Sequence, residues 1–261
     1  MNSSFDMLTK DLKELGIKRG DTVIVHSSLS SMGEVKGGAE TVISALLYIL
    51  GDEGTLLFPA FSYSSVYETH RFSYADTPVC VGKIPETFRH MEGVIRSIHP
   101  THSVAAIGRL ARSLTEGHEN DRTPMGVNSP YRKLADADAL ILMLGCSLSS
   151  VSYMHALEEE AGVEYCLTPY EVEYTVDLPH RSYTDKYRKH NFRRKNFRIT
   201  QEYTRCVDVL EKDVDYFQGK VHGANSYLIK CKNLREKALS VMSESPYYFV
   251  GLPEGYVPGT E

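Results

Sequence analysis

The sequence predicts an α/β protein with a central, mostly parallel sheet flanked by helices, and three observations carry this prediction. Short runs of β-branched and other apolar residues, such as 22–26 and 55–59, are typical of buried strands. Between these two runs, residues 39–50 place apolar side chains at helical spacing. Glycine-containing turns separate the segments, and this strand, helix, strand order is the βαβ unit of a parallel sheet.

The other elements of the first part follow in order from the same pattern. A helix is predicted over residues 5–15, because apolar residues recur at helical spacing and Gly16 follows them. The elements after residue 59 are predicted as a long loop at 62–79, helix 84–91, strand 104–108, helix 109–116, a helical turn at 131–135, strand 139–144 and helix 152–161.

The character of the sequence changes after Cys166. Residues 171–178 alternate as expected for an antiparallel strand, whereas 207–227 and 234–241 are predicted to be mostly helical. We therefore expect two parts. An α/β core spans residues 1–165, and a smaller antiparallel and helical C-terminal part, residues 166–261, packs on it.

Length and composition indicate a soluble globular protein. The chain has 261 residues, of which 42% are hydrophobic and 24% charged, enough for one large domain with a full core. No apolar stretch approaches the roughly 20 residues that span a bilayer, and the first residues do not resemble a secretory signal. We expect a cytoplasmic protein with no membrane partner, and a homo-oligomer is compatible with the sequence.

The five cysteines indicate neither a disulfide framework nor a zinc site. Their number is odd, their spacing is irregular and no C-x-x-C motif occurs. Cys146 follows the strand at 139–144 and is either a nucleophile or, as we expect, a small apolar core thiol. No G-x-S-x-G motif supports a hydrolase serine. No metal site is expected.

Positive charge is concentrated in residues 180–198, called here the basic segment. It holds eight of the 29 Lys and Arg residues and one of the 34 Asp and Glu residues, in a chain of net charge −5. It is a solvated surface, a nucleic-acid contact or the site of a phosphorylated small molecule. A pI near 6.1 and the absence of a nucleic-acid-binding motif argue against nucleic acid. The interleaved aromatic residues that could stack on a base are Tyr183, Tyr187, Phe192 and Phe197.

Two segments carry groups suited to a phosphate or a pantetheine arm. Ser27 and Ser28 follow the strand at 22–26, and Gly37 and Gly38 precede a helix, so hydroxyls and helix N-terminal amides come together. An ordinary strand-to-helix turn would use the same residue types. The second segment, residues 96–103, holds more polar side chains than the first.

Arg96 could pair with a phosphate, and Pro100 holds His99 extended. His99 and His102 give only a weak metal signal, because two histidines three residues apart have no third ligand nearby. The alternative is a polar turn whose histidines are satisfied within the protein.

His155 is the candidate catalytic residue. Glu158 and Glu159 lie three and four residues further along the predicted helix, on the same face. A carboxylate there could orient the imidazole, which could then take a proton from an amine as it attacks a thioester. The alternative is a solvated face of an amphipathic helix.

Together these segments resemble the aminoglycoside 3-N-acetyltransferase family, the antibiotic N-acetyltransferases that differ from the GNAT fold. The resemblance covers residues 5–165 well. It rests on His26-Ser27-Ser28, Gly37-Gly38, Gly54-Thr55-Leu56 with Pro59, Arg96-Ser97, His99-Pro100, Ser103, Gly145 and His155.

This resemblance implies an acyl-CoA donor and His155 as the general base that activates an acceptor amine. Glu158 or Glu159 would orient His155, and His190 is a second catalytic candidate in the acceptor site. The CoA-binding residues it implies are His26, Ser27, Ser28, Gly37, Gly38, Arg96, Ser97, His99, Thr101 and Ser103. Residues 1–165 would bind the acyl-CoA and residues 166–261 the acceptor.

The sequence departs from the family in the acceptor half. Some aminoglycoside-modifying members carry acidic residues just before the histidine that aligns with His190, where this chain has Tyr187 and Lys189. Because aminoglycosides are polycations, a basic segment disfavours them and favours a phosphate-bearing acceptor. The resulting hypothesis is acylation of an amino sugar, linked to a nucleotide, for surface polysaccharides. The alternatives are an aminoglycoside acetyltransferase that confers resistance and a non-catalytic CoA- or nucleotide-binding module.

Overall fold

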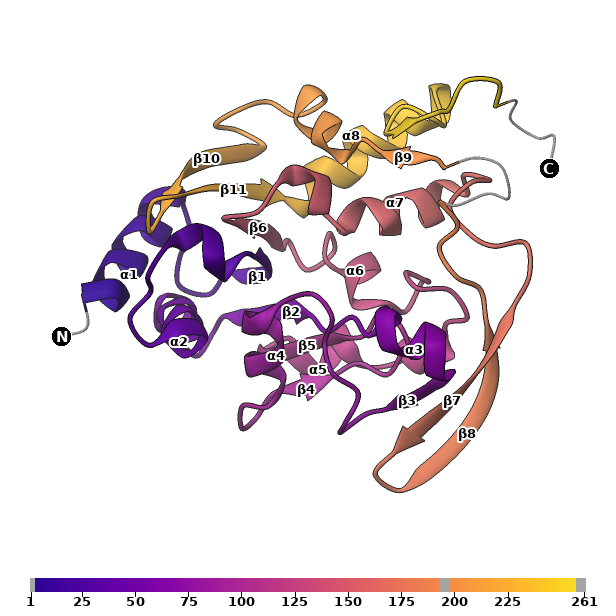
Figure 1. The fold of residues 1–261 in the computed structure, drawn as a ribbon. Helices are drawn as coiled ribbons and strands as arrows, with labels where there is room; N and C mark the ends of the chain where they lie inside the picture. Colours follow the sequence, from indigo (N-terminus) through magenta and orange to yellow (C-terminus); the bar gives the residue numbers. More distant parts are fainter. Residues whose placement is uncertain (1–2, 193–197, 257–261) are drawn as a thin grey trace.

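A seven-stranded sheet runs through the middle of the molecule (Figure 1), in a computed structural model that describes residues 3–192 and 198–256. Its strand order is β10-β11-β6-β1-β2-β5-β4. The strands are β1 (Thr22–Ser27), β2 (Thr55–Pro59), β4 (Ile95–Arg96), β5 (Val104–Gly108), β6 (Leu140–Leu144), β10 (Tyr216–Val221) and β11 (Ala224–Lys230).

The sheet is mixed, so the α/β class is confirmed while the expectation of a mostly parallel sheet needs correction. Only β1 pairs in parallel, with β2 on one side and β6 on the other. The outer pairs are antiparallel. The physical reason is the connections: helix α2 (Gly38–Leu50) links β1 to β2 as a crossover, whereas short turns join β4 to β5 and β10 to β11.

The prediction of a mostly helical stretch at 207–227 is wrong. After a 3-10 helix at Tyr203–Asp208, this region forms the hairpin of β10 and β11. Its two-residue turn is His222-Gly223, with φ of 47° and 80°. Positive φ at both positions matches the twist of a tight hairpin, and the alternation of apolar residues in β11 then pairs with β6 in the sheet.

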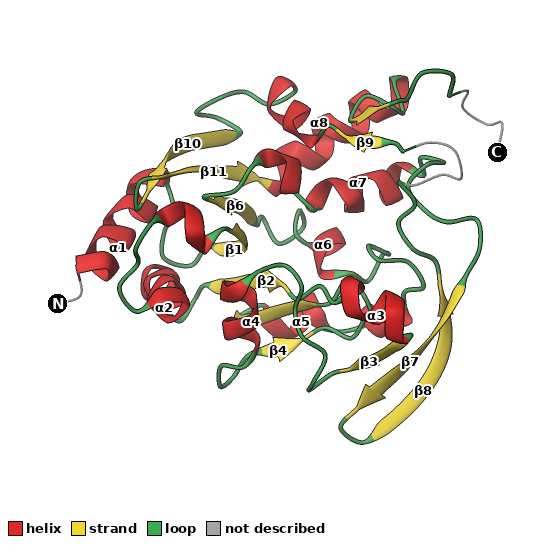
Figure 2. Ribbon diagram, in the orientation of Figure 1, coloured by secondary structure: helices red, strands yellow, loops and turns green. Residues whose placement is uncertain are grey.

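Helices cover both faces of the sheet (Figure 2), and each face has its own core. Neighbouring residues of β1 point in opposite directions: Val23 and Val25 join one core, Ile24 the other. Besides α2, the helices are α1 (Ser3–Leu15), α3 (Tyr63–Thr69), α4 (Lys83–Arg89), α5 (Ala111–Thr115), α6 (Pro130–Lys133), α7 (Tyr153–Ala161) and α8 (Cys231–Glu244). Shorter 3-10 turns lie at Leu29–Met32, His118–Asn120 and Leu148–Ser150.

Two smaller sheets complete the fold. Strands β3 (Arg71–Ser73), β7 (Val172–Leu178) and β8 (Arg181–Tyr187) form one, with β7 and β8 as an antiparallel hairpin that extends beside α3 (Figure 1). Strands β9 (Thr200–Gln201) and β12 (Val250–Gly251) form the other. The long loop expected at 62–79 instead contains α3 and β3.

The central sheet draws strands from both parts of the chain that the sequence distinguishes. Strands β1, β2, β4, β5 and β6 come from residues 1–165, and β10 and β11 from residues 166–261. The assignment of separate binding roles to these two parts stays a prediction. None of the helices in the described ranges is both long and apolar enough to span a bilayer.

Candidate active site

A cavity of about 760 Å³ opens where the parallel strands end. Ser27 at the end of β1, Pro59 at the end of β2 and Cys146 just after β6 all line it. The chain leaves β6 through Gly145 at φ 68°, a conformation that favours glycine, and a Cβ there would clash with Ser31 Oγ. The carboxyl edge of parallel strands is where open α/β folds bind ligands.

His155 enters this cavity from the first turn of α7. The helix buries Met154 and Leu157 against the core, and this leaves His155 facing the cavity. Its Nδ1 lies 2.8 Å from the hydroxyl oxygen of Tyr203 and 3.3 Å from Glu158 Oε2. Because Nδ1 is engaged by these groups, Nε2 is the ring nitrogen open to a ligand.

Glu158 is completely buried and is held by tyrosine hydroxyls. Tyr203 donates to its Oε2 at 2.6 Å, and Tyr165 donates to its Oε1 at 3.0 Å. These hydrogen bonds satisfy a carboxylate that is fully enclosed by protein. Sequence reasoning missed both tyrosines. Tyr203 lies 48 residues from His155, and Tyr165 follows the end of α7, so helical spacing links neither to the site.

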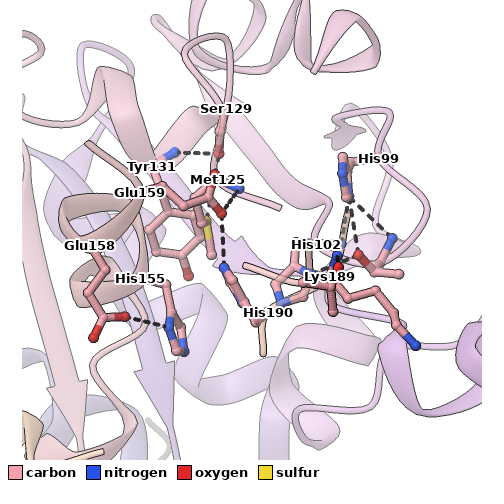
Figure 3. Close-up of polar contacts among 12 residues, drawn as sticks. His99, His102, Met125, Ser129, Tyr131, His155, Glu158, Glu159, Lys189 and His190 are labelled. Carbon is pink, nitrogen blue, oxygen red and sulfur yellow. Dashed lines mark hydrogen bonds and ion pairs between the residues drawn. The ribbon is translucent and has the colours of Figure 1, made fainter. Parts of the chain in front are cut away.

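Glu159 serves a different histidine. Its Oε1 accepts hydrogen bonds from His190 Nε2 and from the Met125 amide, both at 2.9 Å (Figure 3). Of the two glutamates expected beside His155, therefore, only Glu158 contacts it. His190 nevertheless joins the site, since its ring stacks on that of His155 with centroids 4.4 Å apart.

Burial keeps His26, His102 and His155, three of the histidines that line the cavity, neutral at pH 7. It lowers the pKa of His155, an effect to which His190 adds and which the hydrogen bond to Glu158 opposes. Burial likewise lowers the pKa of His26 to about 4, and that of His102 well below its usual range. A neutral imidazole at pH 7 has the lone pair that a general base needs.

The first predicted CoA segment meets the cavity only in part. His26 and Ser27 line it, and the Ser27 hydroxyl is buried with no hydrogen-bond partner among the described residues. Ser28 lies beside this segment, with its hydroxyl 3.3 Å from that of Ser30. Gly37 and Gly38 lie at the N-terminus of α2, outside the residues that line the cavity.

The segment 96–103 is built into the protein. The Arg96 guanidinium is almost fully buried and donates to the carbonyl oxygens of Ala60 and Thr77 and to Ser103 Oγ. This arrangement leaves no exposed guanidinium edge for a phosphate. It braces the loop on which His102 reaches the cavity.

The other residues of this segment are also enclosed. Ser97 Oγ lies 2.9 Å from His118 Nδ1, and the buried His99 ring stacks on His118. Thr101 Oγ1 lies 2.8 Å from His102 Nδ1. Most of these contacts fit the polar turn considered as the alternative, but His99 Nε2 is buried with no hydrogen-bond partner among the described residues. Their proposed role with CoA therefore rests on the resemblance alone.

Cys146 lines the cavity, but its side chain is a protonated thiol and not a nucleophilic thiolate. Burial raises its pKa to about 12, so the nucleophilic thiolate is scarce at neutral pH. The described residues include no cluster of three or more His, Cys, Asp or Glu side chains that could hold a metal ion.

The basic segment meets the cavity through one charged residue of its described part. Lys189 lines the cavity, with Nζ 4.8 Å from the centre of the Tyr67 ring. Arg188 instead donates to the carbonyl of Thr168. No Asp or Glu is among the described residues that line the cavity. Arg193, Arg194, Lys195 and Phe197 lie outside the described residues.

The protein is therefore of the α/β class. It has a cavity at the carboxyl edge of its parallel strands, and His155, with Glu158 behind it, lies on the cavity wall as in an enzyme active site. The chain belongs to the aminoglycoside 3-N-acetyltransferase family, whose model matches residues 24–243. This confirms the expected family and its non-GNAT fold.

Individual proteins that are similar to this chain support the same family. Aminoglycoside N(3)-acetyltransferase VIII of Streptomyces fradiae is 33% identical over 176 residues, which are 59% of this chain and 60% of that protein. The crystal structure of YokD from Bacillus subtilis has a TM-score of 0.75 at 26% identity and covers 94% of this chain and 95% of its own. The match spans about three fifths of the length of the curated relatives.

A further solved structure carries a ligand. The aminoglycoside acetyltransferase AAC(3)-IVa, crystallised as a histidine-to-alanine mutant in complex with a gentamicin, has a TM-score of 0.80 at 25% identity. The alignment covers 95% of this chain and 92% of that one. The likeness therefore extends beyond the part of the sequence that aligns with curated relatives.

Proposed function

We propose that this protein transfers an acyl group from an acyl-CoA to the amino group of an amino sugar. The observation that carries the proposal is His155, which is a neutral imidazole on the cavity wall with Nδ1 anchored and Nε2 open. Family membership supports the same chemistry. Acyl-CoA donors are cytoplasmic metabolites, so the proposal places the protein in the cytoplasm.

The reaction needs a base but no covalent enzyme intermediate. The acceptor nitrogen attacks the thioester carbon and forms the N–C bond, and His155 Nε2 takes the proton that the nitrogen loses. Backbone amides of the loops at the strand ends stabilise the oxyanion. The C–S bond then breaks, and the CoA thiolate takes the proton from the imidazolium. Glu158 stabilises the transient positive charge on His155.

The donor would approach along the end of β1. The unpartnered Ser27 hydroxyl is placed to bind a polar group of the thioester or pantetheine arm, with His26 and Ser28 beside it. At the N-terminus of α2, Gly37 would offer its backbone amide to a phosphate, with Gly38 beside it, whose own amide donates to the Val35 carbonyl at 2.9 Å. Arg96 is left out of this proposed site, because its guanidinium is used inside the protein.

Aminoglycosides are the acceptors that the relatives favour. The curated relatives carry this activity in their names, and the structurally similar AAC(3)-IVa was crystallised with a gentamicin. His190 would lie near the acceptor amine, because it lines the cavity and stacks on His155.

A nucleotide-linked amino sugar, as used for surface polysaccharides, is a second candidate because of the cavity's charge. Lys189 is the one charged side chain other than histidine among the described lining residues, and no carboxylate is present there to hold a polycation. A cation above Tyr67 would instead attract a phosphate.

Thiol release separates these acceptors. Acetyl-CoA and a longer acyl-CoA are each offered with kanamycin and with UDP- and dTDP-linked amino sugars, and CoA is measured colorimetrically. Turnover with kanamycin supports the aminoglycoside activity, and turnover with nucleotide sugars alone supports the second candidate. If none of these amines releases CoA above the rate without enzyme, while acyl-CoA binds, the protein is a binding module instead.

A further inference from the structure

The contact between His155 and its glutamate runs mainly through a third side chain. The direct distance from His155 Nδ1 to Glu158 Oε2 is 3.3 Å, beyond the usual range of an N–H···O hydrogen bond. The path through the Tyr203 hydroxyl consists of two shorter contacts, 2.8 Å to Nδ1 and 2.6 Å to Oε2. Hydrogen bonds of that length are typical of charged or strongly polarised partners.

The direction of each hydrogen bond follows from the number of protons. The Tyr203 hydroxyl has a single proton, which it donates to the carboxylate of Glu158. Its oxygen can then only accept from His155, so the proton of the neutral imidazole must sit on Nδ1. That tautomer leaves the lone pair on Nε2, which faces the cavity.

Burial fixes this arrangement. Tyr203 is 1% exposed and Glu158 is not exposed at all, so neither can exchange its partner for water. The titratable groups that face His155 are Glu158, Tyr203, His190 and, more distantly, His26, His102 and Glu159. Of these, Tyr203 makes the short hydrogen bond to His155 Nδ1, and Glu158 lies next, at 3.3 Å.

We propose that Tyr203 is a positioning residue for the acyl transfer, because it selects the Nδ1–H tautomer of His155 and couples it to Glu158. The inference rests on the proposed function. When His155 takes a proton from the amine, the Nδ1–H bond to Tyr203 and the Tyr203 bond to Glu158 strengthen together. His155 is thus a base that acts together with Tyr203 and Glu158. Tyr203 comes from the segment that follows β9.

Tyr203→Phe tests this directly, and Tyr165→Phe is the matched control. Both variants remove one hydroxyl from Glu158, but only Tyr203 also contacts His155. We expect Tyr203→Phe to lower kcat by about tenfold to a hundredfold, less than the roughly 100-fold to 10,000-fold of a general base because His155 itself remains, with an unchanged KM for acyl-CoA. Tyr165→Phe should stay within about threefold of the wild type.

Two further readouts distinguish positioning from a merely structural role. The acidic limb of the pH profile should move to lower pH in Tyr203→Phe, because the imidazolium loses a hydrogen-bond acceptor. ¹⁵N NMR of His155 should show the Nδ1–H tautomer in the wild type and a mixture in Tyr203→Phe. The proposal is overturned if Tyr203→Phe keeps the tautomer and the pH profile, or matches Tyr165→Phe in kcat.

The outcome is separable from the fate of the proposed function. A wild type that acylates no amine refutes the function itself, yet the tautomer measurement still decides whether Tyr203 sets the imidazole. If Tyr203→Phe does not fold, Glu158→Gln replaces it, since an amide that donates to Tyr203 would reverse the hydrogen bonds. Retention of the Nδ1–H tautomer in Glu158→Gln would then contradict the proposal.

Discussion

The imidazole rings of His155 and His190 stack with their centroids 4.4 Å apart, and each ring has a glutamate of its own, Glu158 beside His155 and Glu159 hydrogen-bonded to His190. Glu158 and Glu159 are neighbours in sequence but diverge to these two histidines. Two stacked imidazolium ions repel each other. The environment of His155 therefore disfavours its protonated form, so the imidazole is neutral and free to take a proton from a substrate.

Replacing His190 should make His155 more basic. His190 is the second cause, after burial, of the lowered pKa of His155. In His190→Gln the burial remains but the second titratable ring beside His155 is gone, so the pKa of His155 rises toward 6.5. The acidic limb of kcat/KM should move to higher pH, as measured in a series of buffers from pH 4.5 to 8. A limb that stays in place or moves lower would contradict this account of the pair.

The buried histidines predict a loss of stability in acid. Burial lowers the pKa values of His26, His99, His102, His118 and His155 below 6.5. The unfolded chain therefore binds protons that the folded protein excludes, so the free energy of unfolding is greatest above pH 6.5. It should fall as the pH drops below 6.5, by up to about 1.4 kcal/mol per pH unit for each histidine.

Urea unfolding at pH 7.5, 6 and 5 measures this slope. A free energy of unfolding that is flat between pH 7.5 and 5 would show that these histidines are not neutral in the folded protein. His118→Gln is a useful comparison, because His118 lies behind the cavity and its replacement should reduce the slope without removing a residue that lines the cavity.

Arg96 should matter for stability and not for CoA affinity. Its guanidinium satisfies the carbonyls of Ala60 and Thr77 in a buried site. Arg96→Met leaves these acceptors without their charged donor, at a cost of about 2 to 4 kcal/mol in the free energy of unfolding. The KM for acyl-CoA should change less than twofold. A stable variant whose KM for acyl-CoA rises tenfold would return Arg96 to the phosphate site that the sequence suggested.

Lys189 should determine which acceptors bind. Lys189→Glu replaces a cation on the cavity wall with a carboxylate, which would attract a polycation and repel a phosphate. We expect KM for kanamycin to fall and KM for a nucleotide-linked amino sugar to rise, each by about threefold to tenfold at low ionic strength. Lys189→Met controls for loss of the side chain's shape. Equal changes in KM for both acceptors would show that Lys189 does not determine which acceptor binds.

Local sequence patterns predicted the fold well where structure is set locally. Strands β1, β2 and β6 and helices α1, α2 and α7 lie where hydrophobic spacing placed them. The patterns failed at the hairpin of β10 and β11, where pairing with β6 outweighs the helical character of the sequence. The mixed sheet escaped prediction for the same reason, since strand direction depends on partners far along the chain.

The candidate site shows the same division. Helical spacing brought Glu158 to His155, because residues three apart on a helix share a face. It could not reveal Tyr203, or that Glu159 turns to His190. The sequence shows that segment 96–103 is rich in polar groups, but only the fold shows that most of them face inward.

The most direct test of the account is the rate of acyl transfer in His155→Gln, measured as thiol release with the best wild-type acyl-CoA and acceptor pair. The variant should bind acyl-CoA normally and lose about 100-fold to 10,000-fold in kcat at pH 7.5, as expected for removal of a general base. A variant that retains wild-type turnover would remove His155 from the chemistry and contradict the proposed mechanism.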